Sequence, residues 1–251
     1  MKKPGALPQI SRPLLSLFTR YTTSYLGRHF HSVRVLSAAP PPDEKPGPLV
    51  VFLNHAAWWD PLVCLFLARK VFPGRAAYGP MDAAALERYG FFRRLGFFAV
   101  ETETTRGAAQ FLRTSSAILE RPGSALFLTP QGKFADVRAP LILAPGIEHL
   151  AARAPQARFV PLAIEYAFWE ERKPEVLLAF GAGEMPDAAT SLTERLAATQ
   201  AGLATAVQRR QPNEWEMLLR TRSGVSRPYD LWRWARARLR GEAFRADHAP
   251  L

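Results

Sequence analysis

The feature that most constrains this chain is an alternation of short apolar runs with stretches in which apolar residues recur at helical spacing. It begins after SAAPPPDEKPGP (37–48), where clustered prolines preclude regular structure. Such alternation predicts an α/β fold with a mostly parallel central sheet flanked by helices. The expected strands are 49–53, 75–79, 96–100, 124–129, 159–165 and 175–181, and the expected helices are 60–72, 107–120, 146–154 and 191–210.

Helical extensions are expected on both sides of this core. Apolar residues recur at near-helical spacing over 10–28, and 31–37 alternates in the manner of an edge strand. We therefore divide the sequence into three segments. These are an N-terminal helix, edge strand and Pro-rich linker at 1–48, an α/β core at 49–183, and a helical C-terminal extension at 184–251.

The charge and the cysteine content limit the classes of binding partner and the cellular compartment that we expect. The chain has 33 basic and 22 acidic residues, a formal net charge of +11, which favours either nucleic acid or an anionic membrane surface as a partner. Cys64 is the only cysteine, so we expect no disulfide and no cysteine metal cluster, which suits a reducing compartment. No apolar run approaches the roughly 18 residues that span a bilayer, and the basic N-terminal stretch is too broken for a signal peptide. We expect a cytoplasmic protein, soluble or peripheral.

The stretch LNHAAWWDP (53–61) holds the candidate catalytic pair, because Asp60 follows His55 by five residues at the end of an expected strand. Ligands of parallel sheets bind outside the carboxyl ends of the strands. A carboxylate on one imidazole nitrogen fixes the tautomer and stabilises the imidazolium, which leaves the other nitrogen to act as a general base near neutral pH. On its own the spacing also fits a loop histidine and a helix-capping aspartate. Of Trp58 and Trp59, we expect one to pack in the core.

Four blocks in order resemble the phospholipid/glycerol acyltransferase family, which includes the lysophosphatidate acyltransferases. Asn54-His55 followed by Asp60 is similar to the family's N-H-x-x-x-x-D motif. GFFAVET (96–102) is similar to its second block, LTPQGKF (128–134) to its F-P-E-G-T-R block, and VPLAI (160–164) to its V-P-x-x-I block. The resemblance covers about residues 31 to 183, and each block falls on an expected strand or strand end.

The resemblance implies an acyltransferase of phospholipid biosynthesis. His55 would take the proton from the acceptor hydroxyl, and Asp60 would orient His55. The acceptor oxygen would attack the thioester of acyl-CoA or acyl carrier protein, so the donor is a co-substrate and neither a cofactor nor a metal is implied. The implied acceptor is a lysophospholipid of the 1-acylglycerol-3-phosphate kind. Acylation of another lipid alcohol or glycolipid, thioester hydrolysis, and a catalytically silent lipid-binding protein on the same fold stay as alternatives.

The third block departs from the family at the positions that bind the acceptor. Gln131 stands where the family has glutamate, and Phe134 where it has arginine. The turn residues are kept, so backbone amides there could face an oxyanion or a phosphate, and three nearby cations could rebuild the phosphate site. Otherwise the acceptor is less anionic than lysophosphatidate. The expected substrate-binding residues are Asn54, Arg106, Pro130, Gln131, Gly132, Lys133 and Arg138.

The C-terminal stretch RPYDLWRWARARLRGEAF (227–244) indicates where much of the positive charge acts. As a helix it would place Trp232 and Trp234 on one broad apolar face and Arg233, Arg236 and Arg240 on the opposite face, with Arg238 intruding on the apolar side. That pattern fits an interfacial membrane helix; a helix packed on the domain with a solvated basic face is the alternative. No recognised nucleic-acid motif accompanies the arginines. We therefore expect peripheral binding to an anionic membrane surface at its cytoplasmic face, and no nucleic acid.

Overall fold

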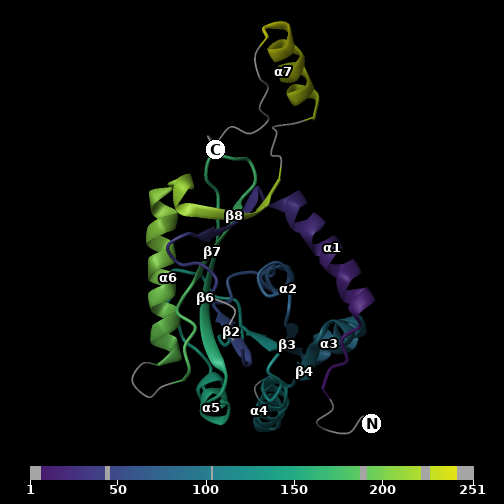
Figure 1. The fold of residues 1–251 in the computed structure, drawn as a ribbon, viewed down its shortest axis with the longest axis vertical. Coiled ribbons are helices and arrows are strands. Elements are labelled where there is room, and N and C mark those ends of the chain that lie inside the picture. The colour runs from purple at the N-terminus through teal and green to yellow at the C-terminus, as the bar shows by residue number, and fades with distance from the viewer. Residues whose placement is uncertain (1–6, 43–45, 103, 187–190, 222–226, 242–251) are drawn as a thin grey trace.

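The computed structural model describes residues 7–42, 46–102, 104–186, 191–221 and 227–241. Within these ranges the strands form a sheet of eight in the order β4-β3-β5-β2-β6-β7-β1-β8, which Figure 1 shows with helices on both faces. The strands are β1 Ser32–Leu36, β2 Leu49–Leu53, β3 Ala76–Asp82, β4 Phe97–Val100, β5 Ser124–Leu128, β6 Arg158–Ala167, β7 Glu175–Phe180 and β8 Trp215–Arg220. The expected α/β fold class is confirmed.

Most neighbouring strands of this sheet run parallel. β2 pairs in parallel with β5 and β6, β3 with β5 and β4, and β1 with β7, while β6–β7 and β1–β8 are antiparallel. Every residue of β2 and of β5 is buried. A parallel strand covered by helices on both faces has this uninterrupted apolar character, so the carboxyl ends of the central strands open at a common edge.

The expectation of an edge strand at 31–37 is wrong. β1 lies between β7 and β8, and all five of its residues are buried. β8 pairs with it from Ser32↔Arg220 to Leu36↔Trp215. β8 escaped the sequence reading because WEMLLR mixes charged and apolar residues, and only its tryptophan is buried. The sheet therefore draws strands from all three segments into which the sequence is divided.

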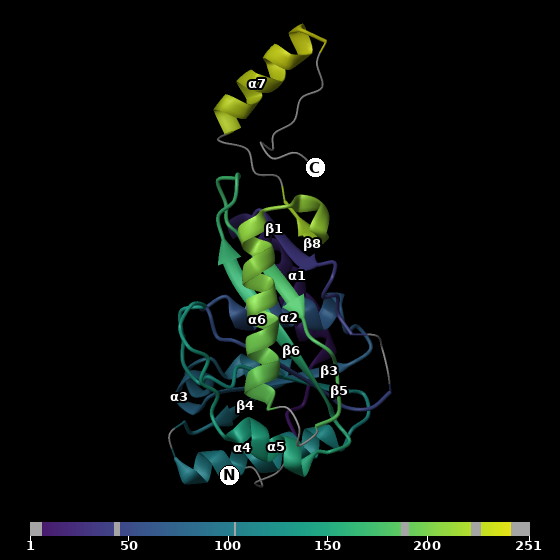
Figure 2. The same ribbon diagram turned by 90° about the vertical axis from the view of Figure 1, so that its left-hand side faces the viewer.

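Different helices cover the two faces of the sheet. α1 and α2 pack over the face that carries Val51 and Leu53, whereas α4, α5 and α6 pack over the face that carries Val50 and Phe52. α6 runs along the outside of β6 and β7 (Figure 2), and it begins with the capping box of Ser191 and Glu194 that its sequence predicts. The helices are α1 Arg12–His29, α2 Asp60–Lys70, α3 Ala83–Arg88, α4 Thr105–Leu119, α5 Gly146–Arg153, α6 Leu192–Arg209 and α7 Arg227–Leu239, with 3₁₀ helices η1 Gly90–Leu95 and η2 Pro212–Glu214.

α7 stands clear of the sheet and its covering helices in both views (Figures 1 and 2). It occupies most of the predicted helix 227–244, of which 242–244 lie outside the described residues. None of the described helices is both long enough and apolar enough to cross a bilayer.

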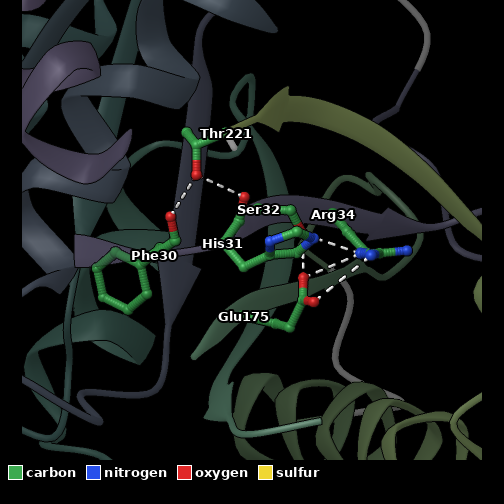
Figure 3. A network of polar contacts seen from close by, with 6 residues as sticks. All are labelled: Phe30, His31, Ser32, Arg34, Glu175 and Thr221. Atoms are coloured by element: carbon green, nitrogen blue, oxygen red, sulfur yellow. Dashed lines mark hydrogen bonds and ion pairs between the residues drawn. The ribbon is translucent and has the colours of Figure 1, made fainter. Parts of the chain in front are cut away.

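A buried ionic network joins β1 to β7 (Figure 3). The guanidinium of Arg34 donates through Nε to Glu175 Oε2 at 3.0 Å and to Ser32 Oγ at 2.9 Å, and Ser32 donates in turn to Glu175. Just before β1, the hydroxyl of Thr221 donates to the carbonyls of Phe30 and His31 at 2.7 and 2.8 Å. These contacts fix the start of β1 against both of its neighbours.

Replacing Arg34 by Met should lower the free energy of unfolding by about 3–5 kcal/mol, because the buried Glu175 carboxylate would lose its cation. Urea denaturation measures this change. The double replacement Arg34→Met with Glu175→Leu should recover most of the loss. Arg209→Met is the matched control: its pair with Glu214, at 2.8 Å, is largely exposed and should contribute about 0–1 kcal/mol. Equal losses in the two single variants would contradict this assignment.

Candidate active site

The end of β2 is locked to β6 by the side chain of Asn54. Its Nδ2 donates to the carbonyl of Ile164 at 3.0 Å, and its Oδ1 accepts from the Ile164 N–H at 2.9 Å. Backbone pairing of the two strands ends at Leu53↔Leu162, so the amide side chain replaces one further peptide of the ladder. The sequence places Asn54 among the substrate-binding residues; in the structure it is buried, and both of its polar groups bind β6.

His55 and Asp60 meet as their spacing predicts. The Nδ1 of His55 lies 2.7 Å from Oδ2 of Asp60, which also accepts from the Ala57 N–H at 3.0 Å. Asp60 is fully buried, while the His55 side chain is 16% exposed. Since Nδ1 faces a carboxylate it carries the hydrogen, which leaves Nε2 as the acceptor. Asp60 is the first residue of α2, and its side chain binds His55 and the Ala57 N–H. The alternative in which Asp60 only caps this helix is therefore not what the structure shows.

The third block and Ala135, the residue that follows it, hold the main chain of His55 from both sides. Gln131 Oε1 accepts from the His55 N–H at 2.6 Å, and the Ala135 N–H donates to the His55 carbonyl at 2.9 Å. The turn is made at Gly132, whose φ of +70° favours glycine. The ring of Phe134 lies over the imidazole with 4.3 Å between centroids. This block therefore supports the histidine directly.

Tyr166 of β6 is a member of the site that the sequence reading missed. Its hydroxyl donates to Oδ1 of Asp60 at 2.6 Å. Burial, followed by the charge and the hydrogen bond of Asp60, raises the pKa of Tyr166 well above its ordinary value. Alternation along β6 puts Tyr166 on the same side of the strand as Ile164, the last residue of the VPLAI block. Extending that block by two residues would therefore have included Tyr166 among the candidates.

Cys64 is buried one turn into α2. Burial, reinforced by the charge of Asp60, raises the pKa of its thiol well above the ordinary value. A thiol that keeps its proton is not a nucleophile. Among the residues that the structure describes, no group of three or more His, Cys, Asp or Glu side chains could hold a metal ion.

The expected phosphate-binding cations lie on the surface. Arg106, in the first turn of α4, and Lys133, in the turn of the third block, are exposed, and within the described part of the chain neither forms a hydrogen bond or ion pair with His55. Arg138 forms an exposed ion pair with Asp136, 3.7 Å between Nη1 and Oδ2. The structure thus brings His55, Asp60 and Gln131 together by hydrogen bonds, with Pro130 and Gly132 in the adjoining turn. Asn54 precedes His55 and instead ties the end of β2 to β6. The phosphate site stays a prediction.

An apolar pocket lies near the His55–Asp60 pair, between α2, the carboxyl end of β5 and the first and middle part of β3. Two of its lining residues, Leu53 and Pro61, immediately flank the stretch that carries His55 and Asp60. The others are Cys64, Leu65, Ala68, Ala77, Tyr78, Gly79, Pro80, Leu95, Phe97, Phe127, Leu128 and Thr129.

The two tryptophans of the loop differ as expected. Trp59 packs among Tyr25, His29 and Phe30, with ring centroids 5.4, 5.0 and 4.9 Å away. Trp58 is 62% exposed beside it. One tryptophan thus supports the loop and the other faces outward.

Comparison with known proteins finds a solved structure with a similar fold. No protein-family model and no curated protein matches this sequence. Among solved structures, the 1-acyl-sn-glycerophosphate (LPA) acyltransferase PlsC from Thermotoga maritima matches with a TM-score of 0.53 over 78% of each chain, at 15% sequence identity. The fold is similar to that of PlsC. At this identity the likeness concerns the fold alone.

Proposed function

We propose that this protein is an acyltransferase that moves a fatty acyl group from acyl-CoA or acyl carrier protein to a lipid hydroxyl, with His55 as general base. The observation that carries the proposal is the 2.7 Å contact between His55 Nδ1 and the fully buried Asp60 carboxylate. It leaves Nε2 to accept a proton, at the sheet edge where ligands of α/β folds bind. The likeness of the fold to PlsC supports the same reaction class.

This geometry supports the following route. The acceptor hydroxyl gives its proton to Nε2 while its oxygen attacks the thioester carbonyl, and Asp60 stabilises the imidazolium that forms. The tetrahedral intermediate then expels the thiolate of the donor, which takes the proton back from Nε2. No acyl-enzyme is part of this route, in keeping with the buried, protonated Cys64. The acyl chain occupies the apolar pocket that begins at Leu53 and Pro61.

The acceptor we propose is a lysophospholipid of the 1-acylglycerol-3-phosphate kind. The turn at Pro130 and Gly132 lies against His55, and Arg106, Lys133 and Arg138 supply positive charge from α4 and from this loop. One observation favours a second candidate. The ring of Phe134 lies 4.3 Å from the imidazole, at the position where the resembled family has its arginine, which suits a glycolipid or another lipid alcohol.

We further propose that α7 binds the protein peripherally to an anionic membrane surface on the cytoplasmic side. Leu231, Trp232, Trp234 and Leu239 are exposed on it. Arg236 lies 5.4 Å from the centre of the Trp232 ring, and Arg238 5.7 Å from that of Trp234. Tryptophan beside arginine suits the headgroup region, where one side of the helix is apolar and the other meets lipid phosphates.

Replacing His55 by Ala should lower the rate of acyl transfer by at least about 10²–10⁴-fold, the effect of a positioned general base. Asp60→Asn should also lower it strongly, since the imidazolium would lose its counter-charge. Incubation with acyl-CoA and a mixed lipid extract, with the products identified by mass spectrometry, measures the transfer. His149→Ala, an exposed histidine on α5, is the matched control and should keep the wild-type rate. A folded His55→Ala variant with wild-type transfer would rule out the mechanism, and free fatty acid as the sole product would indicate a thioesterase.

An acceptor panel tests the phosphate site. Lys133→Ala and Arg106→Ala should each raise the KM for lysophosphatidate roughly tenfold, as expected when one charge-assisted hydrogen bond is lost. Arg113→Ala, another exposed arginine of α4, should leave that KM unchanged. If lysophosphatidate is used and neither variant alters its KM, the rebuilt phosphate site is wrong. Transfer to a neutral lipid alcohol alone would favour the second candidate.

Sedimentation with vesicles tests the membrane surface. Binding to vesicles that contain phosphatidylserine should weaken as salt rises, since each arginine near such a surface contributes about 1 kcal/mol that salt screens. Trp232→Ala with Trp234→Ala should weaken it further at every salt concentration. Met185→Ala removes an exposed apolar side chain elsewhere and serves as the control. Unchanged binding by the double tryptophan variant would show that the membrane contact lies outside α7.

A further inference from the structure

Asp60 depends on the protein for all of its hydrogen bonds, because none of its surface reaches solvent. Its two carboxylate oxygens are served from different sides. Oδ2 faces His55 Nδ1 and the Ala57 N–H, whereas Oδ1 accepts from the hydroxyl of Tyr166 at 2.6 Å. No other hydrogen bond to Oδ1 is found among the described residues. Without the tyrosine hydroxyl, that oxygen would be buried with no donor.

The position of this hydroxyl is fixed relative to His55. Tyr166 follows Ile164 by two residues on β6, and Ile164 is the residue to which Asn54 ties the end of β2. The Tyr166 ring packs against Phe30, with 5.5 Å between centroids, and Phe30 in turn meets Trp59 at 4.9 Å. The strand that delivers the hydroxyl and the loop that delivers the imidazole are therefore parts of one packed unit.

Tyr166 can act toward Asp60 only as a donor. Its pKa is raised by burial first, then by the charge of Asp60 and by their hydrogen bond, so the phenol keeps its proton. The other titratable groups that face Asp60 are His55 and Cys64, and burial keeps the thiol protonated too. Asp136 and Arg138 of the third-block loop act on Glu165 of β6, whose pKa burial raises while Arg138 lowers it in part. Tyr166 and His55 thus compete for the charge of one carboxylate.

We infer that Tyr166 is a positioning residue for the proposed reaction: its hydroxyl holds Asp60 in the ionised form and in the rotamer that presents Oδ2 to His55. The inference rests on the proposed role of His55 and deepens it. The hydroxyl draws part of the carboxylate charge toward Oδ1, which lowers the affinity of the His55–Asp60 pair for a proton. It thereby keeps the base unprotonated at pH values at which a histidine paired with an unshared carboxylate would already be charged.

Tyr166→Phe is the direct test, because the ring that packs on Phe30 is kept and only the hydroxyl is lost. Loss of the donor raises the proton affinity of the pair, whether the proton settles on His55 or on Asp60. The acidic limb of the pH–rate profile should therefore move to higher pH by about one unit, the scale of one hydrogen bond to a charged group. At low pH the variant should be about tenfold slower, with little change in the KM for either substrate.

The control is Tyr25→Phe. Tyr25 belongs to the same aromatic cluster, 5.4 Å from the Trp59 ring, but its hydroxyl makes no hydrogen bond with a described residue. This variant should keep the wild-type pH profile. An equal shift in both variants would show that the cluster, and not the Tyr166 hydroxyl, sets the behaviour of the base.

A second measurement does not depend on activity. The imidazole of His55 can be titrated by NMR in wild type and in Tyr166→Phe, with its signal identified by its absence from His55→Ala. The titration midpoint should rise in Tyr166→Phe, and an unchanged midpoint would overturn the inference. If wild type transfers no acyl group the proposed function fails, but this titration still decides the role of Tyr166.

Fluorination provides the opposite perturbation and covers the case in which Tyr166→Phe does not fold. A 3-fluorotyrosine at position 166 keeps the hydroxyl and makes it a stronger donor, because fluorine withdraws electrons from the ring. The His55 midpoint and the acidic limb should then move to lower pH. Movement to higher pH, or none, would contradict the assignment.

Discussion

A carboxylate with no access to water must be surrounded by donors or it takes up a proton, and Asp60 is such a carboxylate. Its donors come from two parts of the chain: the loop after β2, which supplies the His55 imidazole and the Ala57 N–H, and β6, which supplies the Tyr166 hydroxyl. Each of these parts is therefore held in place by the need to satisfy the same group. The arrangement of the site follows from this one requirement.

The sheet provides the frame that makes this convergence possible. β2 lies between β5 and β6, all three run parallel, and the loops that leave the carboxyl ends of β2 and β5 are hydrogen-bonded to each other. Asn54 extends the pairing with β6 by one residue, so the chain enters the loop at a fixed point. Gln131 and Ala135 then hold the His55 peptide from the loop that follows β5. Two hydrogen bonds to its main chain therefore hold His55 in place, in addition to the contacts of its side chain.

Many of the strands and the contact between His55 and Asp60 could be predicted from the sequence, because they depend on local residue patterns. The apolar runs predict β2 and β5–β7 to within about a residue or two, the accuracy expected at element ends, and the five-residue spacing of His55 and Asp60 predicts their contact. Tyr166 and Gln131 were not assigned their roles, since their contacts join residues 106 and 76 positions apart and leave no periodic trace. β8 was missed for a related reason. Only Trp215 of this strand is buried, so its pairing with β1 is a long-range contact without an alternating pattern.

The turn around Gly132 separates two tasks within a few residues. The atoms that hold His55 are the Gln131 side-chain oxygen and a main-chain N–H at Ala135, and an N–H is supplied by almost any residue at that position. Lys133, which projects from the same turn, is exposed and takes no part in that support. Its identity can therefore change without moving the imidazole. For the proposed enzyme, this means that single exchanges on the rim can change the substrate preference while the His55–Asp60 pair stays in place.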